Sequence, residues 1–297
     1  MLLELANISK SFGKQEVLKD ISFSVDEGEV LGFLGPNGAG KSTSMRIITG
    51  LLNADSGTVK VMGDYVNENT IELRKNIGYL PEHNPLYTDL YIKEYLDYVA
   101  DSYGVKNKKS RIAELIEMTK LTREQHKKIG TLSKGYRQRV GLAQALIHNP
   151  KILILDEPMS GLDPNQLEEI RQLIKNISKG KTVLLSSHIM QEIEQTCSRV
   201  LILNKGILVA DDNVLALAST TKEFHVSVEF LSVPTAEQIA LFSAFELHEE
   251  RGVYHFVSKE DIREKLFRIS ADNGLVILSM VLQKNSLEMS FRELTRD

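Results

Sequence analysis

The sequence feature that most constrains this chain is the segment GPNGAGKST at residues 35–43. It matches the pattern G-x-x-x-x-G-K-[ST], and it lies between an apolar run at 29–34 that predicts a strand and a helical pattern at 41–49. Glycines let several backbone N–H groups converge on phosphate oxygens, and a helix N-terminus adds the positive end of its dipole. The segment therefore predicts a site for nucleotide phosphates. The alternative is a glycine turn that only joins the strand to the helix.

The residues of this phosphate loop have separate expected roles. Lys41 neutralises charge on the β- and γ-phosphates, and the Ser42 hydroxyl ligates Mg²⁺. The others are expected to line the phosphates: Gly35, Pro36, Asn37, Gly38, Ala39, Gly40 and Thr43.

A second motif, KILILDEP at residues 151–158, brings two adjacent carboxylates to the end of a buried strand. Open α/β sheets bind ligands at that edge. Neighbouring strand residues point to opposite sides. Asp156 is therefore expected in the Mg²⁺ shell, and Glu157 is expected to face an attacking water as its base or its polariser. A capped strand end without chemistry is the alternative.

The order of the predicted elements favours an α/β layered fold. Residues 1–31 are typical of antiparallel strands, and residues 82–150 of a mostly helical insert. Buried strands separated by helices follow, at 152–155, 182–186 and 200–203. We expect one domain at residues 1–220.

The remaining residues, 221–297, predict a small α+β domain. Strands are expected at 224–230, 253–257 and 275–282. A helix between the last two is expected to begin at a capping box formed by Ser258 and Asp261.

Composition excludes several classes of protein. The single cysteine, Cys197, rules out an intrachain disulfide and favours a reducing compartment. The apolar stretches fall short of the ~20 residues of a membrane helix, and no secretion signal precedes the first strand. Residues 221–297 hold 9 Lys and Arg against 13 Asp and Glu, which accounts for the whole net charge of −4. Neither part of the chain shows in bulk the basic excess that nucleic-acid binding requires, so no nucleic-acid partner is expected; a local basic patch within residues 1–220 stays open.

The segment LSKGYRQRVGLAQAL, residues 132–146, makes a family resemblance specific. With the two motifs above, it resembles the signature of ATP-binding-cassette (ABC) ATPases, usually written LSGGQ. Ser133 and Gly135 match, whereas Lys134 replaces a glycine and Tyr136 replaces the glutamine. Ser133 can cap the following helix, and an ordinary capped helix is the bland alternative. The resemblance implies that these four residues, the signature segment, meet the γ-phosphate held by a second copy.

The resemblance covers residues 1 to about 218 and implies a P-loop NTPase cassette with ATP and Mg²⁺ as ligands. Asp163, in a SGLDP segment similar to the D-loop, is implied at the protomer interface. His188 resembles the switch histidine that contacts γ-phosphate and the attacking water. Phe12 resembles the aromatic residue that stacks on adenine, with Val17 beside it; Phe12 as a core residue is the rival interpretation.

One position departs from the family. In IGYLPEHNPLY, Glu82 stands where the family has a glutamine that ligates Mg²⁺ and the water. A carboxylate also suits Mg²⁺, because this ion prefers hard oxygen ligands. Its negative charge near γ-phosphate is expected to weaken ATP affinity or to raise its dependence on Mg²⁺.

The function implied by the resemblance is that of the ATP-hydrolysing subunit of an ABC transporter. Such a chain is expected to form a head-to-tail homodimer around two ATP molecules. It would energise transport through separate integral membrane subunits, from the cytoplasmic face of the cell membrane, without inserting into the bilayer itself. The segments EHNPLY, SKGYRQR and SLEMSFRELT look closest to the gliding-motility-associated ATPase subunit of Bacteroidetes.

Two other functions compete with this one. The first is a soluble ABC-type ATPase acting on nucleic acid or ribosomes, which the single cassette and the charge distribution disfavour. The second is a nucleotide-dependent regulator without hydrolysis, which the presence of Lys41, Ser42, Asp156, Glu157 and His188 disfavours.

Some residues have no assigned chemistry. Tyr91, Tyr95 and Tyr98 share one predicted helix face, which suits packing inside the insert or contact with a membrane partner. Three histidines, His225, His248 and His255, are scattered without metal-ligand spacing and are expected as surface or strand residues. Residues 221–297 are expected to stabilise the dimer, to regulate the ATPase or only to pack on the cassette.

Overall fold

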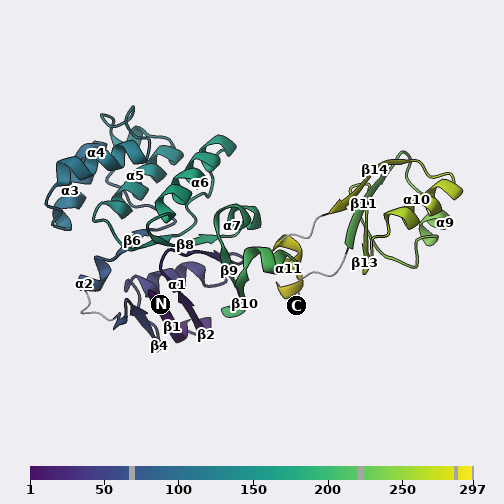
Figure 1. Ribbon diagram of the computed structural model, residues 1–297, viewed down its shortest axis with the longest axis horizontal. Coiled ribbons are helices and arrows are strands. Elements are labelled where there is room, and N and C mark those ends of the chain that lie inside the picture. Colours follow the sequence, from purple (N-terminus) through teal and green to yellow (C-terminus); the bar gives the residue numbers. More distant parts are fainter. Residues whose placement is uncertain (67–70, 220–223, 284–286, 296–297) are drawn as a thin grey trace. The chain divides into compact units, whose positions relative to one another are not determined.

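The computed structural model describes residues 1–66, 71–219, 224–283 and 287–295. Two compact units are present, Met1–Val214 and Leu215–Asp297 (Figure 1). The predicted domain boundary between residues 220 and 221 lies outside the described residues.

The first unit is built around a six-stranded sheet in the order β10-β9-β3-β8-β7-β6. Its strands are β3 (Val30–Leu34), β6 (Ile77–Leu80), β7 (Ile152–Leu155), β8 (Thr182–Ser187), β9 (Arg199–Asn204) and β10 (Ile207–Asn213). All neighbours pair in parallel except β10, which pairs antiparallel with β9. The carboxyl ends of β3, β6, β7 and β8 therefore share one edge, where ligands bind in such sheets. The predicted α/β fold class is confirmed.

A second, antiparallel sheet has the order β2-β1-β4-β5. It consists of β1 (Leu3–Phe12), β2 (Gln15–Val25), β4 (Ser56–Val61) and β5 (Asp64–Tyr65). One buried apolar cluster joins side chains of this sheet, such as Leu5, to Phe33 of the six-stranded sheet and Met45 of α1 (Lys41–Ile48). Helix α1 is therefore held by packing against both sheets, which fixes the position of its N-terminus (Figure 1).

The predicted helical insert contains α3 (Ile92–Ser102), α4 (Lys108–Met118), a 3₁₀ turn (Ile129–Thr131) and α5 (Lys134–Leu146). Helices α2 (Ile71–Arg74), α6 (Pro164–Ser178) and α7 (Met190–Thr196) complete the unit. The three tyrosines expected on one face do not share one environment. Tyr95 is buried and its hydroxyl donates to Gln144 Oε1 at 2.9 Å, whereas Tyr91 and Tyr98 are exposed. Tyr98 nevertheless packs on Tyr87 with ring centres 5.7 Å apart, so packing inside the insert describes Tyr95 fully and Tyr98 in part.

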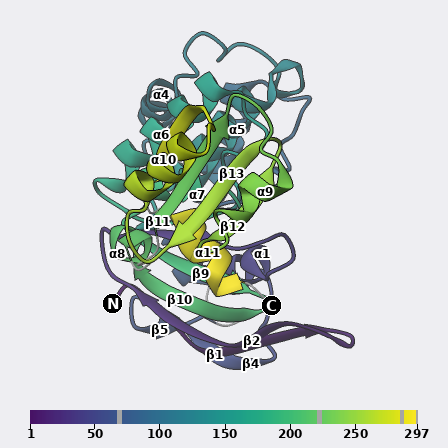
Figure 2. The same cartoon turned by 90° about the vertical axis from the view of Figure 1, so that its right-hand side faces the viewer.

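Helix α8 (Val214–Ser219) begins at the last residue of the first unit and continues into the second. The second unit also contains β11 (Phe224–Phe230), α9 (Ala236–Ala240), β12 (Glu246–Glu250), β13 (Val253–Ser258), α10 (Arg263–Asp272), β14 (Ile277–Gln283) and α11 (Leu287–Thr295). From β11 to β14 the order is strand, helix, two strands, helix, strand. The sheet order β12-β13-β11-β14, antiparallel throughout, makes this a ferredoxin-like split βαβ arrangement. Its core packs Phe242 and Leu266 against Val228 and Phe256, and Figure 2 shows β11, β13 and β12 side by side.

The predicted capping box in this unit is wrong. Helix α10 begins at Arg263 with Ile262 at its N-cap. Ser258 ends β13 instead, and its hydroxyl accepts the N–H of Glu260 at 3.3 Å. Asp261 accepts the N–H of Arg263 at 3.1 Å, a local bond that starts the helix later than the sequence pattern indicates.

The three histidines of this unit are scattered in sequence, but the fold places them on one sheet face. His255 lies opposite His248 on β12 and opposite Ser227 on β11, whose hydroxyl is 3.0 Å from His255 Nδ1. His225, two residues before Ser227, points to the same side because strand residues alternate. Among the described residues, no group of three or more His, Cys, Asp or Glu side chains is arranged to hold a metal.

Candidate active site

The phosphate loop turns between β3 and α1 through conformations that favour glycine. Gly38 has φ +81° and Gly40 has φ +109°, both in the left-handed region. At Gly35 the limit is space, because a Cβ there would lie 2.3 Å from the carbonyl oxygen of Leu203 on β9. The loop is therefore pressed against the sheet, and α1 begins at Lys41 directly after it.

Lys41 lies inside this loop and is 5% exposed. Its Nζ donates to the carbonyl oxygens of Gly35 at 2.7 Å and Pro36 at 3.3 Å, and it lies 3.7 Å from Glu157 Oε1. Burial lowers the pKa of Lys41, and the neighbouring carboxylates of Glu157 and Asp156 oppose that shift. The ammonium group of Lys41 therefore has protein oxygens as its present neighbours, and the oxygens of a bound phosphate can take their place as hydrogen-bond acceptors.

Asp156 and Glu157 follow β7 and point in different directions, as expected. Asp156 is 2% exposed and accepts a hydrogen bond from Ser186 Oγ at 2.6 Å. The N–H of Glu157 donates to the same Ser186 oxygen at 2.9 Å. Glu157 has φ +49°, an unfavourable conformation for a residue with a Cβ that costs roughly 1–2 kcal/mol. Ser186, on the neighbouring strand β8, thus holds the strained turn that separates the two carboxylates.

The Glu157 carboxylate is fixed through both of its oxygens. Oε2 lies 2.8 Å from His188 Nδ1, and Oε1 faces Lys41. Burial raises the pKa of Glu157, while His188 and Lys41 oppose the shift. A buried carboxylate whose pKa is raised and whose orientation is fixed is suited to accept a proton from water.

A cavity of about 410 Å³ brings together most of the predicted residues. Ten of its lining residues were predicted: Val17, Asn37, Gly38, Gly40, Lys41, Ser42, Thr43, Glu82, Glu157 and His188. Gln15 and Ser160 also line it and were not predicted. Ser160 belongs to the SGLDP segment, so that motif was the signal that could have identified it.

The proposed metal ligands also lie together. Ser42, Glu82 and Asp156 line one adjoining cavity of about 590 Å³. A hydroxyl and two carboxylates are hard oxygen donors, which suit Mg²⁺. Magnesium sites usually take one or two protein carboxylates and complete the shell with phosphate and water, so a larger protein cage is not required.

Several predicted residues lie outside the 410 Å³ cavity. Phe12, at the end of β1, is 49% exposed with Lys10 Nζ 5.7 Å from its ring centre, so the core interpretation of Phe12 is wrong. Gly35, Pro36 and Ala39 belong to the phosphate loop but do not line this cavity, and Asp156, which is 2% exposed, lines the adjoining 590 Å³ cavity instead.

The signature segment and Asp163 also lie elsewhere, at the starts of two helices. Ser133 caps α5, accepting the N–H of Tyr136 at 3.4 Å, and Asp163 caps α6, accepting the N–H of Gln166 at 2.9 Å. The two helix starts are in contact, because a Cβ on Gly135 would lie 2.5 Å from Gln166 Oε1. Neither start lines the cavity that contains Lys41.

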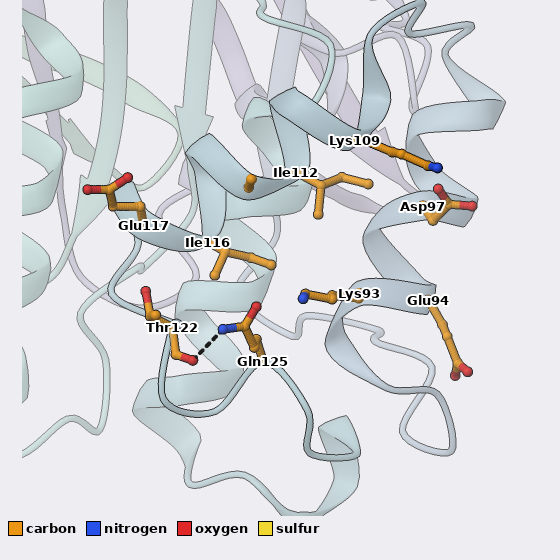
Figure 3. A pocket seen from close by; sticks show the side chains of 10 residues that line it. Lys93, Glu94, Asp97, Lys109, Ile112, Ile116, Glu117, Thr122 and Gln125 are labelled. Atoms are coloured by element: carbon orange, nitrogen blue, oxygen red, sulfur yellow. Dashed lines mark hydrogen bonds between the residues drawn. The ribbon is translucent and has the colours of Figure 1, made fainter.

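A larger cavity, of about 720 Å³, lies between α3 and α4 (Figure 3). Ile112 and Ile116 form its apolar part. Lys109 points toward Asp97, whereas the side chains of Lys93 and Glu94 point away from each other (Figure 3). It contains no residue of the motifs above. Size alone therefore does not locate the chemistry of this protein.

Two models of known protein families match the part of the chain that contains these motifs. The family model described as "ABC transporter" matches residues 18–160, and a model described as "AAA domain, putative AbiEii toxin, Type IV TA system" matches residues 128–194. No helix among the described residues has the length and apolar character needed to cross a membrane.

One relative extends this match over nearly the whole chain, and a second covers more than two thirds of it. The bacitracin transport ATP-binding protein BcrA of Bacillus licheniformis is 34% identical over 298 residues, covering 99% of this chain and 97% of the relative. The linearmycin resistance ATP-binding protein LnrL of Bacillus subtilis is 39% identical over 212 residues, which are 70% of this chain and 68% of the relative.

Solved structures agree with the fold. An ATP-binding subunit of an ABC transporter matches with TM-score 0.67 and 32% identity, covering 73% of this chain and 92% of that one. The ATP-binding cassette MJ0796, a dimer in a post-hydrolysis state with ADP and Pi, matches with TM-score 0.65 and 29% identity over 71% of this chain and 98% of that one. The chain therefore belongs to the ABC transporter ATP-binding proteins, a family that binds and hydrolyses ATP.

Proposed function

We propose that two copies of this chain enclose two ATP molecules head to tail, and that hydrolysis drives a separate membrane transporter. The observation that carries the proposal is the division of the site. Lys41, Glu157 and His188 share one cavity, whereas the capped start of α5 at Ser133 does not line it. A second copy can bring its own signature segment to the γ-phosphate, and the similar MJ0796 cassette is a dimer in its post-hydrolysis state.

The hydrolytic step uses the residues of the cavity. A water oxygen attacks the γ-phosphorus, the bond from that phosphorus to the bridging oxygen breaks, and ADP and phosphate leave. Glu157 accepts the proton of the water, and His188 keeps the carboxylate oriented through its Oε2. Lys41 and the N–H groups of the phosphate loop neutralise the charge that develops on the phosphates.

Mg²⁺ fits the hard oxygen donors of Ser42, Asp156 and Glu82, which line one cavity. When bound, the ion neutralises phosphate charge. In this proposal Phe12 and Val17 contact the adenine from the end of β1 and the start of β2, and Asp163 lies at the interface between the two copies.

The partners and the location are also proposals. We place the chain at the cytoplasmic face of the cell membrane, bound to integral membrane subunits. The names of the relatives, bacitracin transport and linearmycin resistance, favour export as the direction of transport. Residues 1–220 act as the ATPase domain and residues 221–297 as a separate C-terminal domain. The narrower resemblance to gliding-motility ATPases stays a prediction.

The experiment is the ATPase rate per subunit, measured with Mg²⁺ across a series of protein concentrations. The proposal predicts that this rate rises with concentration and then levels off, because only paired copies have complete sites. Lys41→Ala is the matched control and is expected to be inactive at every concentration. A rate per subunit that does not depend on concentration, in a protein that ultracentrifugation shows to be monomeric, would contradict the proposal.

A further inference from the structure

We propose that strand β14 of the C-terminal unit pairs antiparallel with β14 of a second copy, so that the two units share one continuous sheet. This inference rests on the proposed homodimer for its partner, but the interface uses none of the residues of the ATP site. It gives the C-terminal unit a function: to hold two copies near each other before and after ATP binds.

The two edges of the four-stranded sheet differ sharply in charge. One edge strand, β12, has the sequence ELHEE, with all three glutamates exposed. The other edge strand, β14, has the sequence ILSMVLQ, without a charged residue or a proline. An exposed edge strand offers unpaired N–H and C=O groups to which another strand can bind. Proteins usually prevent such pairing with charged side chains, a proline or a β-bulge in the edge strand. Edge β12 is protected by its charge. Strand β14 has one register irregularity against β11, between Ile277 and Ser279, but from Ser279 to Gln283 it pairs regularly and carries neither charge nor proline.

Apolar side chains are also exposed along β14. Leu278 is 57% exposed and Val281 is 53% exposed, and Val276 just before the strand is 55% exposed. Among the described residues, the only strand that pairs with β14 is β11. A row of free backbone groups flanked by exposed apolar side chains is the arrangement that β-strand addition uses.

The charge pattern favours a second copy of the same strand as the partner. When a strand pairs antiparallel with the same strand of a second copy, a two-fold axis relates the two strands. The first residues of one strand then lie opposite the last residues of the other. An uncharged strand meets no like charge in that arrangement, whereas β12 would set glutamate near glutamate at a cost. The axis runs perpendicular to the sheet, so α9 and α10 of both copies stay on one face and do not obstruct the contact.

A contact made by one seven-residue strand is small compared with a stable dimer interface of about 1,200–2,000 Å². Alone it is therefore weak. When ATP already joins two copies, their β14 strands are at a high effective concentration for each other. In the same way, copies already paired at β14 are at a high effective concentration for forming the ATP-bound dimer. Pairing at β14 thus lowers the protein concentration at which the ATP-bound dimer forms.

The test uses the full chain with Val281→Lys and, separately, Ser279→Lys. Both residues are exposed and on the sheet face away from the core, so a lysine leaves the core intact. Phe267→Lys, on α10 and 61% exposed, is the matched control for adding a lysine at an exposed apolar position. Sedimentation velocity without nucleotide, over a series of concentrations, measures self-association. Circular dichroism verifies folding.

The parent chain and Phe267→Lys are expected to self-associate without nucleotide, and the two β14 variants to stay monomeric over the same range. A second measurement uses Mg²⁺ and ATP with every chain also carrying Glu157→Gln. The β14 variants are then expected to dimerise, but at a protein concentration at least about tenfold higher than the parent needs. A parent that stays monomeric without nucleotide, or β14 variants that associate as the parent does, would overturn the inference. Failure of the ATP-dependent dimer in all chains would instead overturn the proposed function.

Discussion

Oε2 of Glu157 lies 2.8 Å from Nδ1 of His188, and the two residues come from the ends of neighbouring parallel strands, β7 and β8. Because those strands are in register, the loop after each one delivers its side chain to the same edge of the sheet. The other carboxylate oxygen faces Lys41 at 3.7 Å. A candidate base is therefore placed between an imidazole and the ammonium group of the phosphate loop.

This placement predicts that Glu157→Gln separates nucleotide binding from hydrolysis. The amide keeps the shape of the side chain but cannot accept a proton from water, so turnover should fall by at least about 100-fold. ATP binding should persist, and the protein should accumulate as an ATP-bound dimer. Steady-state phosphate release and size-exclusion chromatography with light scattering measure the two effects. Turnover within a few-fold of the parent would show that Glu157 is not the base.

Replacement of Glu82 by glutamine should preserve ATPase activity. Glu82, Asp156 and Glu157 together place three carboxylates around Lys41, and each repels the triphosphate. Removing one negative charge while keeping an oxygen ligand should lower the Mg²⁺ concentration needed for half-maximal turnover several-fold. Titration of Mg²⁺ at fixed ATP measures this, with Glu82→Ala as the variant that lacks the ligand. Loss of turnover in a folded Glu82→Gln protein would refute the idea.

A buried histidine away from the site predicts a pH dependence of stability. Burial lowers the pKa of His148 to about 4, and its ring stacks on Tyr103 with ring centres 3.9 Å apart. In the unfolded chain the pKa is near 6.5. As the pH falls from 6.5 towards 4, the unfolded state binds a proton that the folded state excludes, so the free energy of unfolding decreases.

His148→Phe tests this because phenylalanine keeps the stacked ring without a titratable group. At about pH 7.5 the variant should be less stable by about 1 kcal/mol, since the hydrogen bond from Nε2 to the Ile77 carbonyl is lost. Between about pH 7.5 and pH 5 the parent should lose about 2 kcal/mol more than the variant. Urea unfolding at both pH values gives the comparison. Equal losses in the two proteins would mean that His148 titrates normally in the folded state.

The sequence predicted most of the first unit because its signals are contiguous. Interactions between residues close together in the sequence are enough to form each of three features: the phosphate loop, the strand before Asp156 and the helix cap at Ser133. Ser186 could not be predicted in this way. Its role depends on the hydrogen bonds across two strands that hold Asp156 and Glu157, and only the register of β7 against β8 creates them.

The C-terminal unit shows the same limit more strongly. Strand β12 has no alternating apolar pattern, since ELHEE is almost wholly polar, and only its pairing with β13 reveals it. His225, His248 and His255 have no sequence spacing that links them, yet strand register places them on one face. The late start of α10 depends on a competition between local hydrogen bonds at Ser258 and Asp261 that sequence patterns do not rank.

The most direct test of the account is complementation between two inactive variants. Lys41→Ala removes the phosphate ligand of its own copy. Ser133→Asp keeps a good helix cap for α5 but points a negative charge at the triphosphate held by the other copy. Each variant alone should lack ATPase activity. When the two variants are mixed, ATPase activity should return. One of the two ATP sites of a mixed dimer then has the intact phosphate loop of the Ser133→Asp copy and the intact signature segment of the Lys41→Ala copy. A mixture no more active than its separate components would contradict the shared site on which the account depends.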